Sequence, residues 1–551
     1  MAGTAPEAST PSSTPASTAA EDAPPLDDPV RLVVWSARDL IPLLDAGVAV
    51  SRVWDCAEVH RLRHGVWRAD PQEIWCAEHG LDPAGAPSTP QDDLFDFGEH
   101  SDAAAPDALT TPAGYLRGDA VTGAWQAATL PDDPARLLAW ARAAYEMGQR
   151  QQEHCAAAGP RALATAISES AAALVCVELE RTGLPIDRAV MSELITRSAG
   201  PRPESLDAEL AHRAQRDARV TRHLPGHERT DLRNPAQVRE LLLGAGIDVP
   251  NTRKWTLEPF RDAHPVVPAL LQWRADERIA TTYGWRWLAE HVGPDDRLRG
   301  HWTASDGAAG RMTAENGLHN LPVALRAGVR AAPGHRFVRA DLGQIEPRVL
   351  AAVSADPAFM AATRADDLYA PVAARLGVER SVAKVAVLAA MYGQRSGAAG
   401  EALAGLRRAY PTAIALLEDA AERGSRGESV RTFGGRLVHT APPVERGQPA
   451  APPVAAARGR FARNAIIQGT AAELFKAWVA TIRATTRDLG AELVLCLHDE
   501  VLVHVPTEAA PECARRVEQA LTDAARRWQG GEQVRFVADV SIIERWSQAK
   551  D

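Results

Sequence analysis

Two aspartates stand where hydrophobic runs that favour β-strands come to an end. Asp341 follows the run 337–340, and Asp499 lies between the runs 493–497 and 501–505. The second stretch is typical of a strand, a tight acidic turn and another strand. If the strand ends lie side by side, the two carboxylates converge at one edge of a sheet. Oxygen ligands of this kind suit Mg²⁺, and paired metal ions suit an in-line attack at phosphorus.

Each aspartate alone is weak evidence, because an acidic hairpin turn is in most proteins simply solvated. The segment between them carries more information. The Ala, Leu and Met residues of the segment 380–393 favour a helix, and Gly393 is a plausible stop for it. Arg380, Lys384, Leu388 and Tyr392 are spaced by four and form one slowly turning stripe along it. Two cations and an aromatic ring on one stripe suit a triphosphate with its sugar or base.

The alternative for this helix is a surface helix with two solvated cations. Lysine usage argues against it. Of the 61 basic residues only four are lysines, namely Lys254, Lys384, Lys476 and Lys550. A lysine in mid-helix between alanine and valine indicates that a compact ammonium is needed there, since Arg and Lys are not interchangeable.

Five stretches in this order resemble the motifs of the family A DNA polymerases, the group of the bacterial repair polymerase. They are residues 310–322, 341–348, 380–393, 460–473 and 497–500. The resemblance continues more weakly from about residue 165 to the C-terminus. It implies a template-directed DNA polymerase that adds dNTPs to a primer 3′ end, with primer–template DNA and dNTPs as partners.

The resemblance also implies roles for individual residues. Two Mg²⁺ ions would be held by Asp341, Asp499 and the backbone carbonyl of Leu342, and Lys384 would donate a proton to the leaving group. The expected nucleotide-binding residues are Arg380, Lys384, Leu388, Tyr392, Glu346, Gln344 and Tyr369. The expected DNA-binding residues are Arg311, Asn320, Arg460, Asn464, Gln468, His498, Glu500 and Arg348. Glu346 would exclude a ribose 2′-hydroxyl, while Arg311 and Gln468 would touch minor-groove acceptors common to all base pairs.

For Arg311, Asn464 and Gln468 the ordinary alternative is hydrogen bonding within a helix or turn. The order of the motifs favours the functional interpretation.

The chain departs from the family pattern at four positions. Leu342 and Leu388 replace aromatics, Gly343 replaces a small polar residue, and Tyr369 replaces a phosphate-contacting histidine. These departures keep open a second hypothesis, a DNA-binding remnant that serves as a repair scaffold with weak or no synthesis. A third, a phage-type single-subunit RNA polymerase, is disfavoured by Glu346 and Glu500.

The net charge of −10 is unusual for a DNA-binding protein, but its distribution explains it. Residues 1–155 hold 10 arginines and 24 acidic residues, a net charge of −14. Residues 156–551 hold 51 basic and 47 acidic residues, a net charge of +4. The acidity therefore lies outside the part expected to hold DNA.

Six cysteines show no CxxC spacing, so neither a zinc site nor a disulfide framework is indicated. No apolar run approaches the length of a membrane span. The first 30 residues lack Lys, Arg and any hydrophobic stretch, which excludes a secretory signal. We expect a cytoplasmic, nucleoid-associated bacterial monomer without membrane contact.

The expected fold class is α/β multidomain (α+β), a right-hand polymerase with an antiparallel-sheet palm and helical fingers and thumb. Residues 1–30 form a disordered Ala/Ser/Thr/Pro tail, and 31–160 a reduced RNase H-like, exonuclease-type domain with a low-complexity loop at 82–128. The expected thumb spans 161–300, the palm 301–350 and 459–551, and the fingers 351–458. In the thumb, a long helix at 264–288 carries Arg274 and Arg278 toward DNA phosphates.

The exonuclease-type domain is predicted to be inactive. Its chemistry needs Asp-x-Glu on the first strand, and no such pair precedes residue 160. Gln149, four residues after Tyr145, stands where an aspartate would be needed. We interpret the remaining carboxylates, such as Asp55 and Glu58, as a solvated face.

Overall fold

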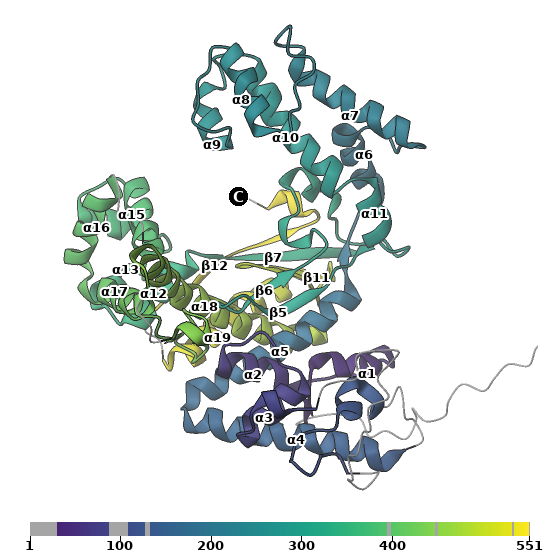
Figure 1. Cartoon of the computed structure of the whole chain (residues 1–551), viewed down its shortest axis with the longest axis vertical. Helices are drawn as coiled ribbons and strands as arrows, with labels where there is room; N and C mark the ends of the chain where they lie inside the picture. The colour runs from purple at the N-terminus through teal and green to yellow at the C-terminus, as the bar shows by residue number, and fades with distance from the viewer. Residues whose placement is uncertain are drawn as a thin grey trace, which may run out of the picture.

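The computed structural model describes residues 30–87, 108–126, 133–393, 398–446, 450–531 and 534–549. Residues 1–29 of the predicted tail and residues 88–107 and 127–128 of the predicted loop at 82–128 lie outside these ranges; in the described part of that loop, Pro83–Gly85 and Ala120–Ala124 form short helices. Figure 1 shows a central sheet, a helical lobe above it (α6–α11), a second helical lobe to its left (α12–α17), and an N-terminal unit below.

The central sheet is four-stranded and antiparallel, as predicted, in the order β10-β11-β7-β12. Its strands are β7 (His335–Gly343), β10 (Glu492–Leu497), β11 (Glu500–Pro506) and β12 (Val537–Ile543). The predicted strand–turn–strand is confirmed, because Leu497 pairs with Glu500 and only two residues lie between them. β7 is longer than predicted and continues two residues past Asp341.

Three long helices lie under the sheet (Figure 1): α5 (Pro160–Thr182), α18 (Pro452–Thr486) and α19 (Ala510–Gln529). The predicted thumb region included α5, but α5 packs against α18, β5 and β10 instead. The reason is its composition: α5 is apolar around most of its circumference, with Leu174, Val175 and Val177 buried, so it is a core helix.

By length and composition alone α5 could also span a membrane, and it is the single such helix among the described residues. Its apolar stretch is interrupted by Glu169 and Glu178, so the sequence holds no uninterrupted apolar run of that length. Of its apolar window, 67% is buried inside the protein, as in the core helix of a folded domain.

The lobe above the sheet has a hydrophobic core of its own, which includes Val238, Leu241, Leu270 and Trp273. Its helices are α6 (Arg188–Ala199), α7 (Leu206–Thr221), α8 (Pro235–Gly244), α9 (Lys254–Leu257), α10 (Val266–Thr282) and α11 (Trp285–His291). The long helix predicted for 264–288 is broken between α10 and α11. There the buried Tyr283 leaves helical geometry and donates its hydroxyl to the Asn320 carbonyl at 2.7 Å.

The second lobe consists of α12 (Ile345–Ser354), α13 (Pro357–Ala362), α14 (Tyr369–Leu376), α15 (Arg380–Tyr392), α16 (Ala398–Ala409) and α17 (Pro411–Ser425). The predicted helix at 380–393 is confirmed as α15. It ends at Gly393, whose φ of 72° lies in the left-handed region that favours glycine.

The N-terminal unit contains two parallel strands, β1 (Arg31–Val34) and β2 (Arg52–Asp55), and the helices α1 (Ile41–Asp45), α2 (Cys56–His64), α3 (Pro71–His79) and α4 (Pro134–Ala157). Among the described residues its sheet has no further strand. The predicted solvated face is wrong, since Asp55 and Glu58 are buried. Asp55 caps α2 by accepting the Glu58 N–H at 2.8 Å, and also accepts the Ala37 N–H at 2.6 Å.

A buried ionic network joins α5 to α18, to Arg436 and to the strand β5. Glu169 of α5 accepts hydrogen bonds from Arg436 at 2.6 Å and from Lys476 of α18 at 2.5 Å. Ser305 of β5 (Trp302–Asp306), which pairs with β6 (Arg311–Ala314), contacts all three side chains. The side chains of Glu169 and Lys476 are fully buried. The network fixes α5, α18 and the β5–β6 hairpin relative to one another.

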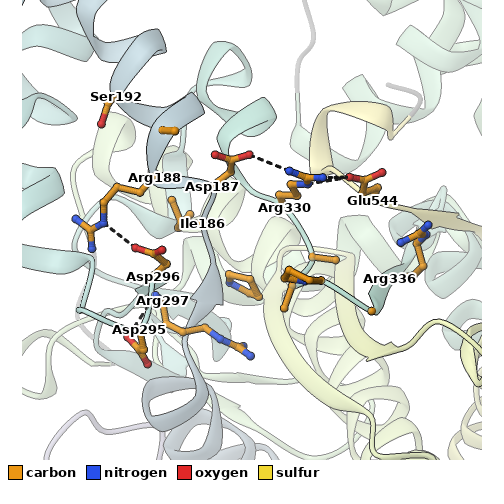
Figure 2. A pocket seen from close by; sticks show the side chains of 16 residues that line it. Ile186, Asp187, Arg188, Ser192, Asp295, Asp296, Arg297, Arg330, Arg336 and Glu544 are labelled. Atoms are coloured by element: carbon orange, nitrogen blue, oxygen red, sulfur yellow. Dashed lines mark hydrogen bonds and ion pairs between the residues drawn. The ribbon is translucent and has the colours of Figure 1, made fainter.

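Ion pairs line a cavity of about 1040 Å³ (Figure 2), and those of Arg330 connect the start of the upper lobe to the end of β12. Arg330 lies between Asp187 and Glu544, at 3.3 Å and 2.7 Å, and Arg188 pairs with Asp296 at 2.7 Å. The small sheets β3–β4 (Leu184–Pro185 and Arg297–Leu298) and β8–β9 (Val430–Arg431 and Leu437–Val438) complete the described fold. The six cysteines are buried and free, in keeping with the sequence.

Removing one member of the buried network should destabilise the protein strongly. We expect Glu169→Ala to lower the free energy of unfolding by about 3–5 kcal/mol, since two buried cations lose their carboxylate. Thermal unfolding followed by circular dichroism measures the effect. The matched control is Glu193→Ala, because Glu193 pairs with Arg197 on the surface and its loss should cost less than about 1 kcal/mol. Equal shifts in the two variants would contradict the role of the network.

Beside this network, burial raises the pKa of Glu473 to about 7. Because the folded state keeps this proton longer than the unfolded state, its contribution to stability falls as the pH rises from about 4.5 to about 7. Glu473→Gln should remove that loss and be more stable than the wild type at pH 8, by on the order of 2 kcal/mol. Urea unfolding across this pH range tests it; a difference that does not grow with pH would contradict the prediction.

Candidate active site

Asp341 and Asp499 converge at the sheet edge, as the sequence predicted. Asp341 lies in β7 and Asp499 in the β10–β11 turn, and the Leu342 N–H donates to the Asp499 carbonyl at 2.9 Å. His498 makes the turn possible by adopting a φ of 53°. Burial, and next the Asp499 carboxylate, raise the pKa of Asp341 to about 6; burial also raises the pKa of Asp499. Two carboxylates thus repel each other at one site.

A single guanidinium, Arg339, compensates the carboxylates around Asp341. It donates to Asp341 at 3.0 Å, to Glu500 of β11 at 2.7 Å and to Asp539 of β12 at 3.2 Å. Only 8% of the Arg339 side chain is exposed. Neither Arg339 nor Asp539 was predicted as a site residue. Arg339 could have been found, since it lies two positions before Asp341 on the same face of the strand.

The oxygen-rich edge fits divalent cations. Four carboxylates gather there, and three of them bond to Arg339; burial, followed by the Asp499 carboxylate, raises the pKa of Asp341, and burial raises the pKa of Asp499. Among the described residues no three or more His, Cys, Asp or Glu side chains form a ready cation cage. A metal ion here would therefore take further oxygens from the backbone or the substrate, as Mg²⁺ commonly does.

Beside Asp499 lies a cleft of about 260 Å³ that brings together five of the seven predicted nucleotide contacts and three of the eight predicted DNA contacts. Predicted residues that line it are Arg311, Gln344, Glu346, Tyr369, Leu388, Tyr392, Gln468, His498 and Asp499. They come from β6, the end of β7, α12, α14, α15, α18 and the β10–β11 turn. Segments that are far apart in the sequence therefore line the same cleft.

Glu346 is held from two sides at the centre of this cleft. The Tyr392 hydroxyl donates to one carboxylate oxygen at 3.0 Å, and Arg311 donates to the other at 3.2 Å. Burial and the adjacent Glu346 raise the pKa of Tyr392 to about 12, so its hydroxyl stays protonated as a donor. Glu346 thus has one defined position on the cleft wall.

The stripe on α15 faces the same region. Leu388 and Tyr392 line the cleft, and Lys384 and Arg380 continue the stripe toward the start of the helix. Lys384 is exposed and, within the described ranges, has no hydrogen-bond or ion-pair partner. Arg380 instead pairs with Asp367 at 2.5 Å, a contact that the sequence did not predict.

Two predicted DNA contacts are corrected by burial. Arg348 is fully buried and donates to the carbonyls of Thr363, Arg535, Ala365 and Asp366. It ties α12 to the neighbouring loops and cannot reach DNA. Glu500 is also buried, and accepts from Arg339 at 2.7 Å and Trp546 at 3.0 Å, so it holds the sheet rather than the primer end.

The remaining predicted residues lie outside the cleft lining. The exposed Asn320 offers its backbone carbonyl to Arg278 and Tyr283. Arg460 is exposed beside Gly393, and Asn464 is half-buried on the same helix, α18. Arg274, expected to reach phosphates, donates to the Thr252 carbonyl. His498, by contrast, lies in the cleft with its ring 4.4 Å from that of His319.

Comparison with known proteins places these motifs in one family. The family model for DNA polymerase family A matches residues 202–548, more than half of the chain. The chain belongs to DNA polymerase family A. The matched residues include α7 to α11 of the upper lobe, all of the second helical lobe, the sheet and every residue of the cleft.

Individual relatives are more distant. DNA polymerase I of Chloroflexus aurantiacus is 31% identical over 301 residues, covering 49% of this chain and 31% of the relative. The thermostable DNA polymerase I of Thermus caldophilus is 28% identical over 418 residues, covering 68% of this chain and 47% of the relative. The chain thus spans less than half the length of these family A relatives.

A solved structure supports the fold of the family A chain. The POL domain of Pol1 from M. smegmatis, in complex with DNA primer-template and dNTP, superposes with a TM-score of 0.64. The match covers 92% of this chain and 84% of that chain at 18% sequence identity. The likeness is therefore one of overall fold.

We expect Arg339→Met to make the stability of the protein depend on Mg²⁺. Without the guanidinium the carboxylates of Asp341, Glu500 and Asp539 repel one another, which should cost about 3 kcal/mol. Thermal unfolding in EDTA should show the loss, and Mg²⁺ should recover more stability in the variant than in the wild type. Arg336→Met, on the same strand but away from the carboxylates, is the control. A variant that Mg²⁺ leaves unchanged would contradict a cation site at this edge.

Proposed function

We propose that the chain is a template-directed DNA polymerase that adds dNTPs to a primer 3′ end by two-metal phosphoryl transfer, without proofreading. The observation that carries the proposal is the meeting of Asp341 and Asp499 at the sheet edge beside the cleft that Leu388 and Tyr392 line. Family membership supports it. In this proposal the sheet is the palm, α12–α17 the fingers and α6–α11 the thumb.

Phosphoryl transfer needs positioning and neutralisation of charge more than covalent help from the protein. Asp341, Asp499 and the Leu342 carbonyl would hold two Mg²⁺ ions, which activate the primer 3′-hydroxyl and stabilise the leaving pyrophosphate. Arg380 and Lys384 bind the triphosphate. Lys384, with no competing partner among the described residues, donates a proton to the leaving group.

The cleft wall accounts for sugar and base-pair selection. Glu346, fixed by Tyr392 and Arg311, occupies the space that a ribose 2′-hydroxyl would need. Arg311, which bonds to Glu346, and Gln468 also line the cleft and contact minor-groove acceptors that every correct base pair presents. The site therefore tests the shape of a base pair without reading its sequence.

The absence of proofreading rests on the N-terminal unit. No Asp-x-Glu pair, which the exonuclease chemistry would need on the first strand, precedes residue 160. Asp55 is used as a helix cap, and Gln149 donates to the Tyr145 hydroxyl at 2.8 Å. We therefore assign this unit a structural role.

We further propose that the enzyme is a cytoplasmic monomer that acts in the repair or replication of bacterial DNA.

A primer-extension assay tests the function. The wild type should extend a primer with dNTPs and much more weakly with NTPs. Asp499→Ala should lower the extension rate at least about 10³-fold, because it removes a carboxylate proposed to hold the cations that stabilise the transition state. Asp488→Ala, an exposed aspartate paired with Arg516, is the control and should keep wild-type extension.

Three results would overturn parts of the proposal. Extension that survives unchanged in Asp499→Ala would exclude the mechanism. DNA binding without extension by the wild type would favour the scaffold hypothesis. Loss of 3′ nucleotides in the absence of dNTPs would show that the enzyme proofreads.

A further inference from the structure

Asp367 occupies a junction between the sheet edge and the α15 helix. It lies just before α14 and accepts hydrogen bonds from three elements. Arg380 at the start of α15 donates to both of its oxygens, at 2.5 Å and 3.1 Å. Gln344, directly after β7, donates to it at 3.1 Å, and so does the Tyr369 N–H at 3.2 Å.

The palm side of this junction is rigid. Gln344 has a φ of 57°, a conformation that non-glycine residues adopt rarely. Its side-chain oxygen also accepts the Leu368 N–H at 2.8 Å. Gln344 therefore makes two hydrogen bonds to the segment that carries Asp367, one to the Asp367 carboxylate and one to the Leu368 N–H. Asp367 in turn forms an ion pair with Arg380. Through this chain of contacts the position of Arg380 is coupled to the strand that carries Asp341.

The two cations on the α15 stripe consequently differ. The charge of Arg380 is already met by a bidentate carboxylate, and its side chain lies 5.8 Å from the Tyr369 ring. Lys384, one turn on, has no hydrogen-bond or ion-pair partner in the described part of the chain. The Arg380–Asp367 pair is open to solvent, with 55% and 34% of the side chains exposed. A strong anion can therefore reach it and compete for the guanidinium.

We propose that Asp367 is a positioning residue that holds Arg380 in reserve, so that a triphosphate recruits this arginine and a diphosphate does so much less. The proposal rests on the function proposed above. A ligand first meets Lys384, and only one with enough charge at its far end displaces Asp367 from Arg380. Asp367 then remains bonded to Gln344 and the Tyr369 N–H. The contact thus acts as a threshold for the length of the phosphate chain.

Asp367→Asn tests this idea, because Asn keeps the size of the side chain and one acceptor oxygen but loses the charge that holds Arg380. Binding is measured by calorimetry with inorganic tripolyphosphate and with pyrophosphate, without metal and without DNA. We expect both to bind more tightly, with affinity for pyrophosphate raised about three- to fivefold, the scale of one exposed ion pair, and that for tripolyphosphate raised less. The preference for the longer chain should shrink.

A double-mutant cycle shows whether Asp367 acts through Arg380. In an Arg380→Ala background, Asp367→Asn should change neither affinity. Asp366→Asn is the matched control, since this neighbouring aspartate pairs with Arg535 at 2.7 Å instead and should leave both affinities at the wild-type value. Weaker or unchanged pyrophosphate binding in Asp367→Asn would overturn the proposal, as would an equal effect with and without Arg380.

Steady-state kinetics separate this inference from the proposed function. In primer extension, Asp367→Asn should lower the KM for dNTP and strengthen inhibition by dNDP. A wild type that binds tripolyphosphate as described but does not extend primers would defeat the proposed function and leave the phosphate threshold standing. Extension with an unchanged dNDP-to-dNTP preference in Asp367→Asn would defeat the threshold alone.

Discussion

The register of β7 between β11 and β12 is the constraint on which the site depends. Antiparallel pairing places Glu500 and Asp539 directly opposite Asp341 on its two sides, and residues opposite each other share one face of a sheet. Three carboxylates at one level would push the strands apart. Arg339, buried two residues earlier on β7, bonds to all three and makes the register tolerable. A shift of one residue would turn Asp341 to the other face.

The helices under the sheet then determine where the cleft walls stand. α18 carries Gln468 into the cleft and Lys476 into the buried network with Glu169. The same network holds Ser305 of β5, whose partner strand β6 carries Arg311. The two elements that carry Gln468 and Arg311 to the cleft are thus both held in place by one buried cluster of charges. The N-terminal unit takes part because Glu169 belongs to α5, which packs on both α2 and α18.

The electrostatics of the cleft are partly settled before any ligand arrives. Arg311 and Tyr392 already hold Glu346, and Asp367 already holds Arg380. Among these groups Lys384 keeps its charge exposed. A polyanion entering the site therefore exchanges one set of ion pairs for another. Such exchange favours selectivity over raw affinity, because each recruited cation must first release its resident partner.

Much of the fold was predictable from short-range sequence signals. The alternation around Asp499 predicted the β10–β11 hairpin, and the composition of 380–393 with its terminal glycine predicted α15. These signals lie within short segments, so they can be interpreted without knowledge of the rest of the chain. The break at Tyr283 was missed although Gly284, a weak helix former, follows it directly; the buried hydroxyl bond from Tyr283 to Asn320 that accompanies the break could not be predicted from the sequence. The apolar α5 was assigned to the wrong region because periodicity alone does not say which neighbours cover a helix.

The sequence by itself determined which residue types the site contains: two aspartates at strand ends, a stripe of cations and an aromatic on one helix, and five motifs in family order. Only the tertiary structure decided which charges meet. Arg339 bonds to Asp539 from 200 residues away, Arg348 is buried among carbonyls instead of facing DNA, and Asp367 holds Arg380. Contacts between distant segments depend on strand register and helix packing, which arise from the burial of the whole chain and leave no mark on the local pattern.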